Sequence, residues 1–505
     1  MFTDKLLYQY FRRRQRKIDE VIMNPFPFQE AILKSILKRH SKTEFGKAYG
    51  FNQIASIADY KSAIPILNYE STFPYIEEIM DGKNNVLVNG KVDWFAKSSG
   101  TTGARSKYIP VTKFFLKNGH LKCAWDAASH IYNEDPQAKL FANKNLIMGG
   151  SLEPLAKGKT AGDISAIILH HFPKIGRRFY TPSFEISLME NWDEKIELMA
   201  QTTSEENVIL LAGVPTWTLV LLKKILKQTG KKHIHEVWPN LRTYLHGGVN
   251  FEPYRKLFEE LLPDSKLGFR EVYNASEGYF ALQNEKHKDG MLLLCDHAIY
   301  YEFIPKSEVH QTNPEAISLS EVELHNQYEL VVTTTAGLYR YRMGDIIEFV
   351  NIRPYKIKHR GRVHDSINAY GEELHVSNTD AALGQLCSKY NIAINDYTVA
   401  PKFMNKDQEG LHEWYIEFEK EPSCIETFQT ELDTLLRHLN SDYDAKRSQN
   451  LVMRPLIIHS LPTGTFERYL RSINKYGGQN KMPRLKDDRI IVDKLINRAS
   501  LVNHQ

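Results

Sequence analysis

Hydrophobic residues in the middle of the chain follow two patterns that alternate along the sequence. The runs NVILLAGV (207–214), LRTYLHGG (241–248) and FREVYNASEG (269–278) are short and rich in apolar residues, which predicts strands. Between them, PTWTLVLLKKILKQTG (215–230) and FEPYRKLFEELL (251–262) have the pattern of amphipathic helices. The order strand, helix, strand, helix, strand predicts a mostly parallel sheet covered by helices, so we expect an α/β fold.

The pattern changes at about residue 291. Strand-like runs then follow without helices between them (MLLLCDHAIYYEFIP, YELVVTTTAGLYRYRMGDIIEFV and YKIKHRGRV), which predicts a β-rich subdomain. After HDSINAYGEEL the chain restarts as a smaller α+β unit, with helices expected near 377–390 and within 424–440. We therefore expect two domains, residues 1–365 and 366–505, with a linker near 364–370.

Composition narrows the class of protein. The chain has 505 residues, of which 42% are hydrophobic and 25% charged, as in a soluble protein of two or three domains. A net charge of +4 gives no support for a nucleic-acid partner. No apolar run is long enough to span a membrane. The cysteines lie far apart without metal-ligand spacing, which favours reduced thiols in a cytoplasmic protein; they are Cys123, Cys295, Cys387 and Cys424.

The first 23 residues form a basic, amphipathic segment. Leu7, Phe11, Ile18 and Ile22 share roughly one helical face, and four arginines lie between residues 12 and 16. Such a helix can lie on a membrane surface. The alternative, which we favour, is a helix that docks on its own domain and leaves its basic face in solvent.

The segment SSGTTGARSK (98–107) is the first candidate ligand-binding segment. Its two glycines allow close backbone approach, and its hydroxyl groups and amides are suited to phosphate oxygens. Lys107 lies between Ser106 and Tyr108, so the GxxxxGK[ST] phosphate-loop pattern does not match. Taken alone, the segment is also compatible with an ordinary surface turn.

Two further motifs place candidate ligand-binding side chains at the ends of predicted strands. YNASEG (273–278) ends a predicted strand, where open parallel sheets bind ligands, and it offers a tyrosine, a hydroxyl group and a carboxylate. YRYRMGD (339–345) presents Asp345 after a glycine, and an exposed carboxylate of this kind suits ribose hydroxyl groups. Each motif alone is also compatible with an ordinary strand end or turn.

The last two motifs supply cations. Arg360 and Arg362 come just before the predicted linker, where a charged residue could act in one domain arrangement and not in another. GGQNKMPRL (477–485) holds Lys481 in a glycine-flanked loop, from which an ammonium group could reach an acyl or phosphate oxygen. A solvent-exposed lysine without a role is the alternative.

The ordered combination resembles the adenylate-forming superfamily, which includes firefly luciferase and the acyl-CoA ligases. The core motifs SSGTTGARSK, YNASEG, YRYRMGD and GRVHDSINAYGEEL occur in the superfamily's order. The stretches ILKSILKRHSKTEFGKAYGF, FPYIEEIMDGKNNVL, LPTGTFERYL and GGQNKMPRL are most similar to the Gretchen Hagen (auxin-responsive) family of acyl acid amido synthetases and its bacterial relatives. The resemblance covers nearly the whole chain.

This resemblance implies a fold and a reaction. It implies a large N-terminal domain with α/β and β-barrel-like parts, and a small mobile C-terminal domain. A carboxylic acid would attack the α-phosphate of ATP, with Mg2+ bound, to give an acyl-adenylate and pyrophosphate. An amino acid amine would then attack the acyl carbon and release AMP. The expected partners are therefore small molecules, with no nucleic acid and no membrane.

The resemblance also assigns roles residue by residue. The β- and γ-phosphates of ATP fall to Ser98, Ser99, Gly100, Thr101, Thr102 and Lys107. Tyr273 would contact the adenine, Ser276 the α-phosphate region, and Glu277 a magnesium ion. The remaining roles are nucleotide packing for Tyr341, ribose binding for Asp345, a contact with the ribose or hinge for Arg362, and stabilisation of the adenylation transition state for Lys481.

The acceptor and the acyl pocket are less defined. VHDSINAYGEEL is closer to the acyl-CoA ligase hinge pattern, so coenzyme A is an alternative acceptor to an amino acid. A non-catalytic protein that binds a small acid or nucleotide is a third reading, disfavoured because Glu277, Asp345 and Lys481 are all present. Candidates for an apolar acyl pocket are Trp217, Leu245 and Phe251, which would suit an aromatic or aliphatic acid.

Overall fold

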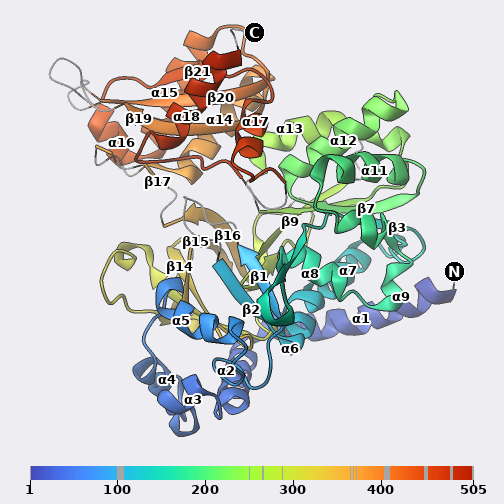
Figure 1. Ribbon diagram of the computed structural model, residues 1–505, viewed down its shortest axis with the longest axis vertical. Coiled ribbons are helices and arrows are strands. Elements are labelled where there is room, and N and C mark those ends of the chain that lie inside the picture. The colour runs from blue at the N-terminus through green and yellow to red at the C-terminus, as the bar shows by residue number, and fades with distance from the viewer. Residues whose placement is uncertain are drawn as a thin grey trace. The chain divides into compact units, whose positions relative to one another are not determined.

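A computed structural model gives the fold of the chain (Figure 1). It describes residues 2–98, 107–248, 251–263, 267–286, 288–363, 366–367, 369–370, 372, 374–402, 410–447, 453–477 and 481–502. These residues form two compact units. Unit 1 comprises Met1–Gly248 and Asp264–His359, and unit 2 comprises Val249–Pro263 and Arg360–Gln505.

Unit 1 is built on a twelve-stranded mixed sheet. Its strands lie in the order β13-β12-β14-β15-β16-β11-β10-β9-β8-β7-β3-β6. The half from β6 to β9 is parallel. The pairs β9–β10, β10–β11, β11–β16, β14–β15, β12–β14 and β12–β13 are antiparallel. The parallel strands are β3 (Lys144–Ile147), β6 (Tyr180–Thr181), β7 (Val208–Gly213), β8 (Thr243–Gly247) and β9 (Gly268–Ala275). The others are β10 (Gly278–Leu282), β11 (Met291–Leu293), β12 (Ile299–Pro305), β13 (Ile317–Ser318), β14 (Gln327–Thr334), β15 (Tyr341–Ile352) and β16 (Tyr355–Arg362).

This topology corrects two expectations. A mostly parallel sheet is found only up to β9, because the chain then turns back at β10 and continues in antiparallel strands. The β-rich segment after residue 291 is present, but its strands extend the large sheet and do not form a separate barrel. The predicted boundary between α/β and β-rich parts is therefore a change of pairing within one sheet.

The helix predicted after β7 is present in unit 1. α12 (Pro215–Thr229) begins with a proline at its first turn and ends before Gly230, whose φ of 67° is the left-handed conformation that glycine adopts without strain. It packs on α11 (Trp192–Thr203). The remaining longer helices of unit 1 are α1 (Phe2–Met23), α2 (Phe26–His40), α4 (Ile57–Ala63), α5 (Tyr69–Met80), α7 (Leu121–Glu134) and α8 (Ile164–His170).

A smaller sheet of four strands accompanies the large one in unit 1. Its order is β2-β1-β5-β4, formed by β1 (Trp94–Ser98), β2 (Lys107–Val111), β4 (Leu152–Leu155) and β5 (Lys159–Gly162). β1 and β2 are antiparallel neighbours, with Ser98 opposite Lys107. Ser98 and Lys107, the described residues that flank the segment 99–106, therefore lie side by side; the segment itself lies outside the described residues.

The helix expected to cover the sheet between β8 and β9 has a different location. α13 (Glu252–Leu261) is a helix as predicted, but it packs on α14 and β19 of unit 2. The hydrophobic pattern of the sequence shows that this helix has an apolar face, but it does not show which surface that face covers. The chain thus enters unit 2, returns to unit 1 for β9, and enters unit 2 again after His359.

Unit 2 has the predicted α+β composition. A three-stranded sheet in the order β19-β20-β21 combines β19 (Ala393–Lys402), β20 (Leu411–Lys420) and β21 (Ile457–Ser460). The expected helices are α14 (Val376–Tyr390) and α15 (Ile425–Leu439), and α16 (Ser441–Arg447), α17 (Thr465–Ser472) and α18 (Ile490–Val502) follow. Trp414 and Tyr397 stack at the centre of this unit with ring centroids 5.6 Å apart.

The N-terminal helix α1 docks on its own unit. Phe11 and Ile18 are buried, as the amphipathic pattern predicts, and α1 packs along α7. Arg14, on the docked side, donates hydrogen bonds to Asp126 at 2.6 and 2.7 Å and to Asp296 at 3.1 Å. No helix among those described is long and apolar enough to cross a membrane.

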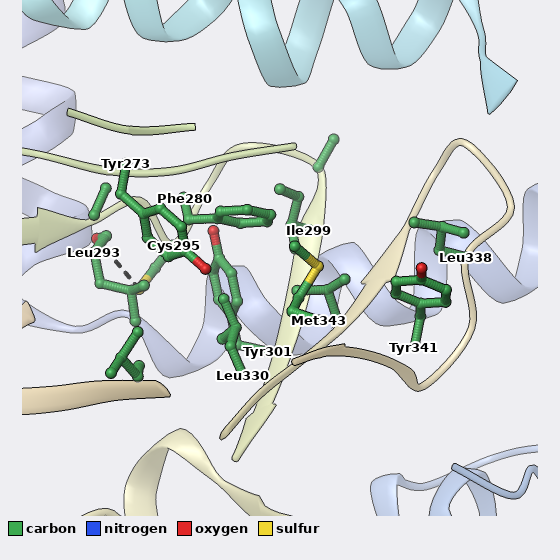
Figure 2. Packing of buried hydrophobic residues seen from close by; sticks show 14 of the residues in the cluster. Tyr273, Phe280, Leu293, Cys295, Ile299, Tyr301, Leu330, Leu338, Tyr341 and Met343 are labelled. Carbon is green, nitrogen blue, oxygen red and sulfur yellow. Dashed lines mark hydrogen bonds between the residues drawn. The ribbon is translucent and has the colours of Figure 1, made fainter. Parts of the chain in front are cut away.

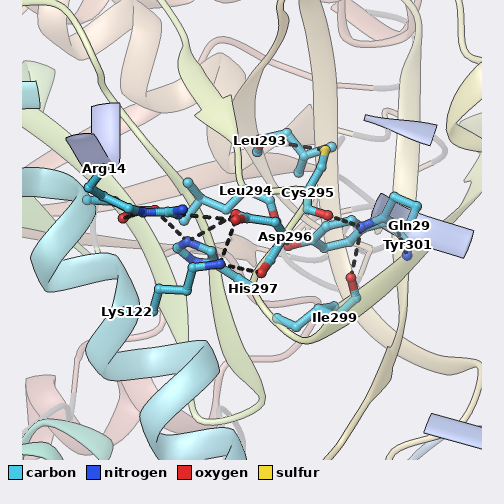
Figure 3. Close-up of polar contacts among 11 residues, drawn as sticks. Arg14, Gln29, Lys122, Leu293, Leu294, Cys295, Asp296, His297, Ile299 and Tyr301 are labelled. Carbon is cyan, nitrogen blue, oxygen red and sulfur yellow. Dashed lines mark hydrogen bonds and ion pairs between the residues drawn. The ribbon is translucent and has the colours of Figure 1, made fainter. Parts of the chain in front are cut away.

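The Arg14 contacts belong to a buried charge network (Figure 3). His297 lies 2.7 Å from Asp126, and Lys122 lies 2.6 Å from Asp296. Burial raises the pKa of the Asp126 carboxyl, but hydrogen bonds from Arg14 and His297 outweigh burial and hold it well below its usual range. Ligand atoms of Asp126, Asp296 and His297 lie close enough together for a metal ion, but both carboxylates are already paired with cations. The network therefore joins α1, α7 and the segment between β11 and β12.

Three buried histidines predict how stability depends on pH. Burial lowers the pKa of His120 to about 3 and the pKa values of His40 and His130 to about 4, from an ordinary value of 6.5. The unfolded chain therefore binds protons below about pH 6.5 that the folded chain excludes. We expect the free energy of unfolding to fall as the pH decreases from 6.5 towards 4.

Urea unfolding at several pH values tests this dependence. His120→Leu should flatten the slope between pH 4 and 6 by about 1.4 kcal/mol per pH unit, the effect of one excluded proton. His310→Asn, which changes an exposed histidine of the same unit, should leave the slope unchanged. Equal slopes in His120→Leu and the unmodified protein would contradict the assignment.

Candidate functional site

Tyr273 and Asp345 bring two of the sequence motifs into direct contact. The Tyr273 hydroxyl donates a hydrogen bond of 2.6 Å to Asp345 Oδ2, and both side chains are buried. Their strands, β9 and β15, are four positions apart in the sheet, which is about 19 Å at the usual strand spacing of a flat sheet. A direct hydrogen bond is possible only because the sheet curls between β9 and β15. The curl places YNASEG beside YRYRMGD.

The ring of Tyr273 lies against two neighbours. Phe280 of β10 lies 4.9 Å away between ring centroids, and Figure 2 shows the two rings side by side. His359 of β16 lies 5.2 Å from the Tyr273 ring, and its Nε2 is 3.8 Å from Asp345 Oδ1. His359 is about one-third exposed. It therefore completes a Tyr–Asp–His group at which a polar ligand can meet a phenol, a carboxylate and an imidazole.

A second contact joins YNASEG to the strand before the serine-rich segment. Ser276 Oγ donates a hydrogen bond of 3.4 Å to the carbonyl oxygen of Lys97 in β1. Ser276 and Glu277 form the turn between β9 and β10, and both are largely buried. The turn that carries the candidate metal-binding carboxylate is thus fixed next to the end of β1.

Tyr69 of α5 connects the other end of that segment. Its hydroxyl oxygen accepts a hydrogen bond of 2.9 Å from the backbone N–H of Tyr108, and Lys107 Nζ lies 5.4 Å from the centre of its ring. Burial raises the pKa of Tyr69, and the charge of Glu277 acts on it in the same direction. The charge of Glu277 thus acts on the same tyrosine that Lys107 contacts, although 170 residues separate Lys107 from Glu277 in the sequence.

The two arginines of YRYRMGD are held by buried glutamates. Arg340 Nε lies 3.1 and 3.2 Å from the carboxylate oxygens of Glu302, and Arg342 Nε lies 3.0 and 3.1 Å from those of Glu329. Both glutamates are 1% exposed. Paired buried charges of this kind are structural ion pairs. Asp345, rather than either arginine, is the group that YRYRMGD brings to Tyr273.

Other expected site residues have different surroundings. Tyr341 is buried in the main hydrophobic cluster of unit 1 together with Leu338 and Met343 (Figure 2). Ser98 ends β1, and Ser99, Gly100, Thr101 and Thr102 lie outside the described residues. Arg362 ends β16 and is partly exposed.

Each of the three candidate acyl-pocket residues packs against neighbours of its own unit. Trp217 of α12 packs on Trp192 of α11, with ring centroids 4.7 Å apart. Leu245 packs against the cluster formed by α1 and α7 residues. Phe251 belongs to unit 2, where its ring lies 5.2 Å from that of Phe258. We therefore define no single cavity from these three side chains.

Lys481 lies in unit 2 on a segment fixed to β19. The carbonyl oxygen of Pro483 accepts a hydrogen bond of 2.7 Å from Thr398 Oγ1, and that of Arg484 accepts one of 2.7 Å from the N–H of Val399. The Arg484 guanidinium donates to Asp380 and, at 3.0 Å, to the Tyr254 hydroxyl of α13. Lys481 itself is exposed at the start of this anchored segment.

Several residues of this site carry no motif signal in the sequence. Tyr69, His359 and Glu329 belong to elements outside the quoted core of each motif, and each reaches the site through a contact over a long sequence separation. Spacing along the chain could not identify them. Glu329 alone has a weak signal, as a charged residue within the apolar run YELVVTTT.

The fold of this chain is shared by solved structures of ligases. Among solved structures with this fold is a 2-hydroxyisobutyryl-CoA ligase in complex with 2-HIB-AMP, at a TM-score of 0.59 and 12% identity over 96% of this chain and 93% of that chain. A GH3.15 acyl acid amido synthetase is more similar, with a TM-score of 0.81 and 17% identity over 96% of each chain.

Sequence models identify the family. The GH3 family N-terminal domain matches residues 14–181 and 155–267, the central domain matches 292–362, and the C-terminal domain matches 377–490. The chain therefore belongs to the GH3 family of acyl acid amido synthetases, which are ATP-dependent acid–amino acid ligases. This confirms the predicted reaction class.

Curated relatives are plant enzymes. Indole-3-acetic acid-amido synthetase GH3.3 of Arabidopsis thaliana is 23% identical over 96% of this chain and 93% of its own length. Jasmonoyl–L-amino acid synthetase JAR4 of Nicotiana attenuata is 24% identical over 63% of this chain and 66% of its own length.

Removing the Tyr273 hydroxyl should lower stability and weaken ligand binding at Asp345. Tyr273→Phe removes a hydrogen bond to a buried carboxylate, which should lower the free energy of unfolding by about 1.5–3 kcal/mol. Tyr443→Phe in unit 2 removes a hydrogen bond of 2.7 Å to buried Asp433 and serves as the matched control. Urea unfolding should show similar losses, while calorimetric titration with ATP should show weaker binding only in Tyr273→Phe. Equal ATP affinities in the two variants would contradict a ligand site at Tyr273.

Proposed function

We propose that the residues around Asp345, Ser276 and the β1–β2 hairpin form the adenylation site of this amido synthetase. The observation that carries the proposal is the pair of contacts from YNASEG, one to Asp345 and one to Lys97. These contacts gather three motifs that are separated by more than 60 residues each in the sequence. A nucleotide bound there would meet ribose-, phosphate- and metal-binding groups within one site.

The first step would be adenylation of a small carboxylic acid. A carboxylate oxygen forms a bond to the α-phosphorus of ATP, and the bond to the bridging oxygen breaks, so pyrophosphate leaves. We assign the ribose hydroxyls to Asp345, the adenine to Tyr273, and the α-phosphate region to Ser276. Tyr341 would pack on the nucleotide from the core of unit 1. Arg362 would contact the ribose or the hinge from the end of β16. Lys107 and the segment Ser98–Thr102 would hold the departing pyrophosphate.

The second step would transfer the acyl group to an amino acid. The amine attacks the acyl carbon, the bond between that carbon and the phosphate oxygen breaks, and AMP leaves with its electron pair while the amine loses a proton. The adenylate makes this possible because AMP is a far better leaving group than the oxide of a free carboxylate. The product analysis described below also tests coenzyme A as the alternative acceptor.

Glu277 suits the magnesium ion that accompanies ATP. Its carboxylate is a hard oxygen ligand, and it lies near Tyr69 and Lys107 at the phosphate end of the proposed site. When bound, Mg2+ would neutralise phosphate charge. Glu277 would hold it, and Lys107 would add a second positive charge.

Lys481 would stabilise charge on the transferring phosphate, and unit 2 would act as a mobile lid that carries it. The support is its position on a segment anchored by Arg484 rather than on a free terminus. An exposed ammonium on an anchored segment keeps its charge and its reach.

We propose the class of acid substrate, the type of family member and the cellular compartment from the residues of the chain. Trp217, Leu245 and Phe251 are apolar, which favours an aromatic or aliphatic acid, the class to which the acids named for the plant relatives belong. We also propose a bacterial-type member of the family, as the resemblance of the sequence motifs implies. All four cysteines are free, which suits the reducing cytoplasm.

Asp345→Asn should impair nucleotide-dependent adenylation. The amide retains the size of the side chain but cannot accept two ribose hydroxyl hydrogen bonds as a carboxylate does, so we expect ATP–pyrophosphate exchange to fall by about 100-fold. Asp433→Asn, which alters the comparable buried tyrosine–aspartate pair of unit 2, is the control. Near-normal exchange in Asp345→Asn would overturn the assignment.

Product analysis identifies the substrates. A panel of aromatic and aliphatic acids is screened by ATP–pyrophosphate exchange, with hydroxylamine to trap any acyl-adenylate. Each active acid is then supplied with mixed amino acids or with coenzyme A, and the products are read by mass spectrometry. We expect amides. A thioester without amides would instead show that this member uses coenzyme A.

Lys481→Ala should slow adenylation without affecting stability. Loss of one cation at a phosphoryl transition state should lower the exchange rate by about 100-fold or more at saturating ATP. Lys420→Ala removes an exposed lysine from β20 of the same unit and should behave as the unmodified protein. The two variants should have equal Tm values, and equal exchange rates would refute the role of Lys481.

A further inference from the structure

Strands β14 and β15 change register at Asp345. Glu329 pairs with Ile346, whereas Val331 pairs with Arg342. Met343, Gly344 and Asp345 therefore stand opposite Leu330 alone, so β15 contains two more residues than its partner at this point. Such bulges bend a strand and redirect its side chains, and they are frequent next to active sites.

The backbone of the bulge requires a glycine. Gly344 has a φ of 74°, in the left-handed region where residues with a side chain are strained. A Cβ atom at this position would meet nothing within 4 Å, so space is available. The constraint is therefore purely conformational.

The carboxylate of Glu329 binds the residue before the bulge and the glycine at its centre. Its Oε1 accepts hydrogen bonds from Arg342 Nε at 3.0 Å and from the backbone N–H of Gly344 at 3.1 Å. Its Oε2 accepts from Arg342 Nε at 3.1 Å and also from the other guanidinium nitrogen. The Arg342 guanidinium additionally donates 2.7 Å to the carbonyl oxygen of Val309. The residues before and within the bulge are thereby tied to β14.

We propose that Glu329 is a positioning residue for nucleotide binding, because it holds the bulge that aims Asp345 at Tyr273. Asp345 follows Gly344 directly, so the backbone that Glu329 holds sets the direction of the Asp345 side chain. Glu329 would not touch the nucleotide. The inference rests on the proposed role of Asp345 and adds a residue that its motif does not contain.

The neighbouring Arg340–Glu302 pair provides a close control. It has the same residue types and an equally buried glutamate, on β12, although Arg340 precedes β15 and is more deeply buried than Arg342. Arg340 also donates to the carbonyl oxygens of Lys61 and Ile64, and the N–H of Gly344 in the bulge binds Glu329 rather than Glu302. Loss of Glu302 should therefore reproduce the general cost of breaking a buried ion pair without moving Asp345.

Steady-state kinetics of Glu329→Gln and Glu302→Gln test the proposal. Glutamine has the shape of glutamate but places an NH2 group against donors, so the bulge should loosen in Glu329→Gln. We expect its KM for ATP to rise about tenfold with a smaller change in kcat, because ground-state and transition-state contacts to the ribose are lost together. Glu302→Gln should keep the KM for ATP within about twofold of the unmodified protein. Equal KM values in the two variants would overturn the inference.

Gly344→Ala keeps the test decisive if Glu329→Gln does not fold. It strains the bulge through φ alone, so it should raise the KM for ATP in the same way, and an unchanged KM would overturn the inference. The variant Asp345→Asn distinguishes a failure of the positioning role of Glu329 from a failure of the proposed nucleotide site. If Asp345→Asn binds ATP normally, the role of Asp345 itself fails. If only Asp345→Asn is impaired while Glu329→Gln and Gly344→Ala are normal, the site stands and the positioning role fails.

Discussion

The hydrogen bond between Tyr273 and Asp345 imposes a shape on the whole of unit 1. Residues of β9 and β15 can meet only if the strands between them curl, because four strand spacings in a flat sheet exceed the reach of the two side chains. The pairing changes from parallel to antiparallel at β10, where the tight turn at Ser276 and Glu277 reverses the chain. The same turn contacts Lys97. One turn therefore lies beside both the antiparallel half of the sheet and the end of β1.

The ion pairs described in unit 1 hold segments of the chain in fixed positions. Arg340 and Arg342 are neutralised by buried glutamates, and Arg14 and Lys122 by buried aspartates. Each pair would be costly to break, because a lone buried charge would remain. The groups left at the proposed site are few and are presented from fixed positions. Preorganised groups of this kind avoid the energetic cost of reorienting during a reaction.

The sequence predicted most elements and the chemistry of the motifs, but not the contacts that assemble them. Hydrophobic periodicity identified β7, α12, β8, α13 and β9, because each has one consistent buried pattern. It placed α13 over the sheet, whereas its partner surface is α14 and β19, which periodicity cannot specify. Asp345 was recognisable from Gly344 in front of it. Glu329, His359 and Tyr69 were not, since curvature and register across distant strands bring them to the site.

The path of the chain through unit 2 bears on how Lys481 would move. The segment after Lys481 is tied to β19 by Thr398 and Val399, and Arg484 ties it to α13 through Tyr254. A movement of Lys481 therefore has to involve unit 2 as a body rather than this segment alone. Because α13 belongs to that body, such a movement acts on the chain between β8 and β9 as well as at the linker after His359. β9 carries Tyr273. A displacement of unit 2 would therefore act on the chain at three points, on both sides of α13 and after His359.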